Sequence, residues 1–195
     1  MCWEPDRTAL ATGLVALTLL TGCVAGPSGG ADRSEVTTPG TANTADASLS
    51  MSAEEAAAQQ RAQAWLEAAA LPEGAVSSPR SPAAFNSHYG WPCRPVATLR
   101  GYWTIAGATV ADTANWLVQH PTADLIVPMQ TTYPADAGGA SIGQVPAPDA
   151  QEGIVYLVVK TPDGVAIRAE IAAMYATATC PSLPPGSQMG GVGQG

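Results

Sequence analysis

Four cysteines and two histidines are the residues of this chain best suited to chemistry. No two cysteines have the C-x-x-C spacing of thioredoxin-like redox sites. His88 and His120 do not have the H-x-x-x-H or H-E-x-x-H spacing with which a helix presents two zinc ligands. His88 lies in a loop, and we predict that it forms no Ser-His-Asp triad. These residues therefore predict no catalytic group, no metal site and no cofactor.

The carboxylates outnumber the cationic side chains two to one, and the net charge is −8. A protein that binds nucleic acid needs a basic stripe to neutralise phosphates, so we predict no nucleic-acid partner. Most acids stand singly in segments expected at the surface, where solvation is their ordinary state. Two carboxylates could still meet across a cleft in the folded chain, because sequence spacing does not test that arrangement.

The amino terminus carries an apolar run followed by a cysteine. Residues 8–20 contain no charge, and the sequence Leu20-Thr21-Gly22-Cys23 follows directly. This segment resembles the lipobox of bacterial lipoproteins. The resemblance implies cleavage between Gly22 and Cys23, diacylglycerol on the Cys23 sulfur, and acylation of the new amino terminus.

The length of the apolar run agrees with a signal peptide. Its 13 residues would span roughly 20 Å as a helix, short of the ~30 Å hydrocarbon core. The mature chain would have a net charge of −7, so anionic headgroups would repel it and membrane attachment would depend on the lipid. We expect an anchored protein on the extracytoplasmic face of the cell membrane. An uncleaved signal anchor is the alternative.

The lipobox also bears on the other cysteines. Cys2 would leave with the signal peptide and Cys23 would carry lipid, which leaves Cys93 and Cys180 in an oxidising compartment. We expect these two to form a structural disulfide; free or redox-active thiols are the alternative.

Composition divides the chain into four parts. Residues 1–22 read as the signal peptide, residues 23–51 as a disordered tether poor in large apolar side chains, and residues 181–195 as a disordered tail. Residues 52–180 form the predicted domain. Ser52 and Thr109 each begin a capping box that opens a helix, and the first helix stops at Pro72 and Gly74.

Strand patterns follow the helices. Apolar residues alternate through 97–105 and are continuous through 154–159, and a turn at 161–164 leads into alternation through 165–171. The last segment would also line one face of a helix, but the turn favours a strand. Residues 125–130 are expected to form a short edge strand, and residues 134–150 a flexible loop. We predict an α+β fold: an antiparallel or mixed sheet of three to five strands with one or two helices on one face.

The loop at residues 75–95 contains several aromatic residues among prolines. Phe85, His88, Tyr89 and Trp91 either cover a thin core near Cys93 or form an exposed surface for a ligand or partner.

Three segments, at residues 65–76, 102–107 and 116–121, loosely resemble uncharacterised secreted proteins of actinobacteria. The resemblance implies export and a single compact domain, and no activity. We therefore expect a non-enzymatic binding or interaction module anchored in the cell envelope, with an unknown envelope ligand or protein as its partner. A carboxylate-based envelope hydrolase is the alternative.

Overall fold

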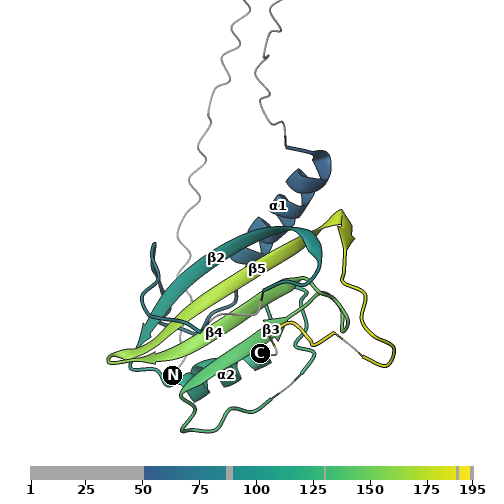
Figure 1. Ribbon diagram of the computed structural model, residues 1–195. Coiled ribbons are helices and arrows are strands. Elements are labelled where there is room, and N and C mark those ends of the chain that lie inside the picture. Colours follow the sequence, from purple (N-terminus) through teal and green to yellow (C-terminus); the bar gives the residue numbers. More distant parts are fainter. Residues whose placement is uncertain (1–50, 87–89, 130, 188, 194–195) are drawn as a thin grey trace, which may run out of the picture. The chain divides into compact units, whose positions relative to one another are not determined.

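The computed structural model describes residues 51–86, 90–129, 131–187 and 189–193. Five strands form one antiparallel sheet with the order β1-β2-β5-β4-β3, and two helices accompany it (Figure 1). In chain order the elements are α1 (Ala53–Glu67), β1 (Val76–Ser77), β2 (Arg94–Ala106), α2 (Val110–Gln119), β3 (Gly139–Gln144), β4 (Gly153–Thr161) and β5 (Gly164–Thr179). The predicted α+β fold is confirmed.

Both helices begin where side-chain capping predicts. The Ser52 hydroxyl accepts a hydrogen bond from the Glu55 amide at the start of α1. Thr109 caps α2 in the same way, accepting from the Asp112 amide at 3.1 Å, and its hydroxyl donates to the Asp112 carboxylate at 2.7 Å. Each cap gives a partner to an amide that the first turn of a helix leaves unpaired.

The three longest strands, β2, β5 and β4, lie side by side in the sheet. A two-residue turn at Pro162 and Asp163 joins β4 to β5, and Thr161 pairs with Gly164. Residues 165–171 therefore continue as a strand, as the turn chemistry predicts, and not as a helix. In the register of β2 against β5, Leu99 pairs with Ile171 and Ile105 with Val165.

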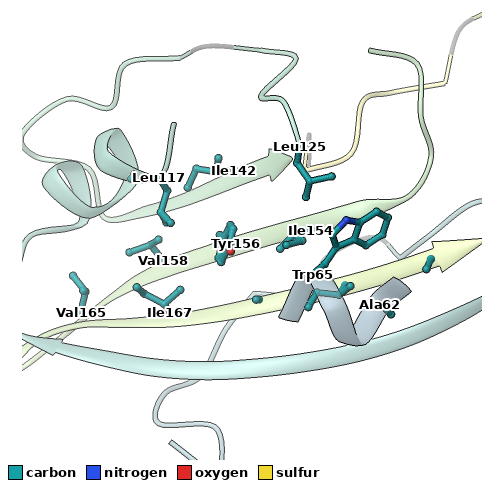
Figure 2. Packing of buried hydrophobic residues seen from close by; sticks show 14 of the residues in the cluster. Ala62, Trp65, Leu117, Leu125, Ile142, Ile154, Tyr156, Val158, Val165 and Ile167 are labelled. Atoms are coloured by element: carbon teal, nitrogen blue, oxygen red, sulfur yellow. The ribbon is translucent and has the colours of Figure 1, made fainter. Parts of the chain in front are cut away.

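The main core lies between the helices and one face of the sheet. Ala62 and Trp65 of α1 and Leu117 of α2 belong to the same buried cluster as Tyr156 of β4 and Ile167 of β5. Figure 2 shows these side chains gathered between the helices and the strands. Because each strand alternates its side chains, the residues between them point to the other face, which neither helix covers. We call this second face the open face.

Cys93 and Cys180 form a disulfide bond that links the residue before β2 to the residue after β5. The predicted bridge is thus confirmed. Since Arg94 pairs with Thr179 at the ends of these two strands, the bond clamps one end of the longest strand pair.

Three local expectations differ from the structure. Residues 125–129 form only an isolated bridge between Ile126 and Val145 instead of an edge strand, because Pro128 cannot donate to a ladder; Gln130 lies outside the described residues. The edge strand beside β4 is β3, inside the segment expected to be a flexible loop. Beyond Pro181, in the expected disordered tail, Val192 is buried, and the Ser141 hydroxyl donates to the Gly193 carbonyl at 2.8 Å.

Within the described part of the chain, neither helix has the length and apolar character needed to cross a membrane.

Candidate binding surface

The open face carries three charged side chains of the sheet, those of Arg100, Arg168 and Glu170. Arg100 of β2 pairs with Glu170 of β5, and Tyr102 of β2 pairs with Arg168 of β5. Directly opposite residues in an antiparallel pair hold their Cβ atoms about 5 Å apart, so these side chains meet on one surface. The fold thus brings together charges that are nearly seventy residues apart in the sequence.

A hollow of about 330 Å³ lies over these residues, and we call it the arginine hollow. Arg94, Arg100 and Arg168 line it together with a single carboxylate, that of Glu170. Gly90, Trp91, Thr98, Leu99 and Ile171 complete its lining.

Three contacts hold the guanidinium of Arg168 in place. Its Nη2 lies 3.2 Å from the Glu170 carboxylate and donates to the Asn86 carbonyl at 2.8 Å. The Phe85 ring covers the guanidinium, with 5.0 Å between Cζ and the ring centroid, which is within the range of a cation–π contact. The side chain of Arg168 is 13% exposed, so this charge is largely fixed.

The carboxylate of Glu170 interacts with a second arginine as well. Arg100 places its Nε 3.4 Å from the same oxygen, Oε1, yet its side chain is 64% exposed. Two guanidinium groups therefore share one carboxylate, and the exposed one keeps most of its surface in solvent.

A larger groove of about 690 Å³ follows β3, and we call it the β3 groove. It is lined by backbone and small side chains of residues 139–143, by apolar side chains of β4, and by Tyr133 and the end of the described chain. Beyond residues 139–143 its lining consists of Asn86, Val118, Pro128, Met129, Thr131, Tyr133, Leu157, Val158, Val159, Val192 and Gly193. None of these residues is an Asp, a Glu, a His or a Cys.

Tyr133 fixes one wall of the β3 groove. Its hydroxyl donates to the Ser141 carbonyl at 2.6 Å. Its backbone amide donates to the Asn115 side chain at 2.8 Å, and its carbonyl accepts from the same side chain at 3.1 Å. Burial raises the pKa of the Tyr133 hydroxyl above its ordinary value, while the bond to Ser141 opposes that shift. The loop that contains Tyr133 is thus attached both to α2 and to β3.

The β3 groove and the arginine hollow are neighbours on the open face. Leu157, which lines the groove, pairs directly with Arg168, which lines the hollow. Asn86 also lines the groove, and its carbonyl binds Arg168. The two hollows share no lining residue, but apolar lining of the groove and cationic lining of the hollow lie on neighbouring strands.

The aromatic residues of the loop at 75–95 are placed differently from one another. Phe85 is half-buried over Arg168, and its ring centroid lies 6.4 Å from that of Tyr102. Trp91 is buried at 7% exposure in a small cluster with Val155 and Ala172, so it covers core on the open face and is not an exposed aromatic anchor.

Other residues that the sequence singles out are not described. His88 and Tyr89, as well as Gly22 and Cys23 of the lipobox, lie outside the described residues.

His120, at the end of α2, contacts the Trp116 carbonyl through Nδ1 at 2.8 Å, and its ring stacks on that of Trp116.

Ser141 stands in a G-x-S-x-G segment, Gly139 to Gly143, so the absence of a hydrolase triad does not follow from the absence of this motif. In α/β-hydrolases this pattern forms a sharp turn between a strand and a helix, which exposes the nucleophile. Here the whole segment lies within β3, and the Ser141 hydroxyl donates to the Gly193 carbonyl. The local geometry is that of a strand residue and not of a nucleophile elbow.

Pairs of carboxylates line two hollows of the described residues, Glu54 and Glu152 in one and Asp136 and Asp163 in the other. Among those residues no group of three or more His, Cys, Asp and Glu side chains could hold a metal ion. Asp136 and Asp163 both line a hollow of about 460 Å³ at the β4–β5 turn, where both are exposed. Glu152 is paired with Arg61 at 3.1 Å.

Comparison of the chain with protein-family models, with curated proteins and with solved structures finds no match.

Proposed function

We propose that this chain is a lipoprotein of the bacterial cell envelope, anchored through lipid on Cys23, whose domain binds a ligand without transforming it. The observation that carries the binding role is the β3 groove. Its volume of about 690 Å³ lies within the range of roughly 300–1,000 Å³ that small-molecule sites occupy. Its lining is mostly apolar, so it suits a ligand with an apolar part.

The chemistry of the lining supports binding over catalysis. Asp, Glu, His and Cys supply most general acids, bases and nucleophiles, and none of them lines the β3 groove. A carboxylate hydrolase would need two carboxylates in a sheltered site, with one pKa raised. The hollow shared by Asp136 and Asp163 leaves both of them exposed, which favours ordinary solvated acids.

The proposed location rests on the lipobox and agrees with the disulfide. A structural disulfide is typical of proteins outside the reducing cytoplasm. The intact mass of membrane-fraction protein tests the anchor. We expect the peptide that begins at Cys23 to carry diacylglycerol and acyl mass in the wild type, and Cys23→Ser to abolish it. A wild-type Cys23 peptide without lipid mass would show that the proposed anchor is wrong.

A substitution that fills the β3 groove tests the binding role. A Cβ built on Gly139 meets only the Val158 carbonyl, at an ordinary 3.5 Å, so Gly139→Val should fold and place a branched side chain in the groove. We expect it to weaken binding of the neutral apolar dye Nile red at least fivefold. Gly138→Val is the matched control, because that Cβ meets nothing within 4 Å and Gly138 does not line the groove. Equal dye binding by wild type and both variants would contradict the role of the groove.

A further inference from the structure

We infer that the ligand of this domain is an amphiphile, with a phosphate or carboxylate group in the arginine hollow and an apolar part in the β3 groove. The inference rests on the proposed binding role of the groove and adds the class of ligand.

The charge of the arginine hollow is opposite to that of the chain. The described residues contain six Lys and Arg side chains, and three of them line this one hollow against a single carboxylate. The local balance is thus two positive charges, whereas the whole chain has a net charge of −8. A cationic site on an acidic protein attracts an anion locally while the remaining surface repels it.

The single carboxylate of the hollow does not neutralise its three arginines. Arg100 shares Glu170 with Arg168 and is 64% exposed, and Arg94 forms no salt bridge with any other described residue. The Nε of Arg168 is buried and has no hydrogen-bond partner among the described residues. Guanidinium groups present several N–H donors in a plane, which suits the oxygens of a carboxylate or a phosphate.

The way in which Arg168 is held favours a role in binding an anion over a role in a structural ion pair alone. The Asn86 carbonyl and the Glu170 carboxylate both contact its Nη2, and the Phe85 ring covers the guanidinium. A charge fixed in this way has already lost its side-chain freedom, so a bound anion does not have to order it.

The nearness of the groove to the hollow favours an apolar part in the ligand. Leu157 pairs with Arg168 across β4 and β5, so the apolar lining begins one strand away from the cationic lining. A free inorganic anion would leave the groove empty, and a neutral apolar molecule would leave the cations unpaired. An anionic head with an alkyl or similar tail satisfies both.

Calorimetry with three probes tests the inference: octyl phosphate, octanol and inorganic phosphate. The Cys23→Ser chain is used, so that no lipid of its own competes. We expect octyl phosphate to bind at least tenfold more tightly than either other probe. The double substitution Arg94→Gln with Arg100→Gln should weaken the binding of octyl phosphate about tenfold and leave the affinity for octanol unchanged. Both side chains are exposed, so the fold should survive, as the urea midpoint would show.

The control variant is Arg80→Gln, which removes an exposed arginine that does not line the hollow. It should leave the affinities for all three probes unchanged. Equal affinities for octyl phosphate and octanol, unaffected by the arginine substitutions, would overturn the anionic head and leave the groove as proposed. If octyl phosphate binds no more tightly than inorganic phosphate, and Gly139→Val does not change its binding, the link between hollow and groove is wrong. Failure of both octyl probes to bind would overturn the proposed function itself.

Discussion

Three fully buried polar residues, Thr122, Gln144 and Tyr156, are linked by hydrogen bonds through the side chain and the backbone amide of Thr122. The hydroxyls of Tyr156 and Thr122 lie 2.8 Å apart, and the Thr122 amide donates to the Gln144 side chain at 2.8 Å. Gln144 in turn donates to the Leu117 carbonyl at 3.0 Å. Buried polar groups with partners fix the arrangement of a core, since any other packing would leave them unpaired. At the residue scale this cluster sets how α2 sits on β3 and β4.

The stability of the protein at alkaline pH should report this cluster. Burial raises the pKa of Tyr156 to about 12, while the hydrogen bond with Thr122 opposes the shift. An unfolded tyrosine titrates near 10, so the folded state holds the proton more tightly. That stabilisation is complete below about pH 10 and is lost as the pH rises through about 12.

Tyr156→Phe removes this titration. We expect the free energy of unfolding of the wild type to fall by about 2–3 kcal/mol between pH 9.5 and 12 from Tyr156 alone, and the variant to show a correspondingly shallower fall. At pH 7 the variant should lose about 1 kcal/mol for the missing hydrogen bond. Urea unfolding across this pH range measures both effects. Identical slopes for the two proteins would show that Tyr156 does not titrate as inferred.

At the scale of elements, the end of the described chain packs on β3. Gly143 is the contact point, because a Cβ there would overlap the Val192 carbonyl. Gly143→Ala should therefore displace residues 189–193 and expose Val192, at a cost of up to about 1.5–3 kcal/mol. Hydrogen exchange of these residues and the urea midpoint measure the change.

Gly190→Ala is the matched control for this displacement, because a Cβ there meets nothing within 4 Å. It should leave both the exchange rates and the urea midpoint of the wild type unchanged. Equal exchange in the wild type and Gly143→Ala would mean that the segment does not depend on this contact.

The elements differ in how far their sequences specify them. Capping by Ser52 and Thr109 predicts both helices, and the turn at Pro162 and Asp163 predicts the last hairpin. These signals are local, so they can be recognised without the fold. β3 has no such signal, since Gly139 and Gly143 lack the side chains that mark a strand. Its pairing with β4, which residues 139–144 alone do not encode, makes it a strand.

The candidate site depends on the whole molecule in the same way. The alternation of apolar residues through 97–105 and 165–171 predicts only that Arg100 and Arg168 face solvent on two strands. They become one cationic hollow because β2 pairs with β5 in a register that sets Arg100 beside Glu170 and Arg168. A non-local register is not visible in residue patterns. Within the loop at 75–95, Phe85 contacts an arginine, whereas Trp91 fills core.

At the scale of the whole domain, the Cys93–Cys180 bond closes a loop with a sequence separation of 87 residues. That loop contains all of β2, α2, β3, β4 and β5. Closing so long a loop lowers the entropy of the unfolded chain, and loop-closure theory gives an upper value of about 4–5 kcal/mol.

Reduction of this bond should therefore lower the free energy of unfolding by as much as about 4 kcal/mol, with the urea midpoint as the measurement. The double substitution Cys93→Ala with Cys180→Ala separates the bond from other effects of the reductant, because its midpoint should be low in both conditions. Since the bond joins the ends of β2 and β5, the loss should appear as unfolding of the whole sheet, with all probes changing together. A wild-type midpoint that is the same with and without reductant would contradict a stabilising role for this bond.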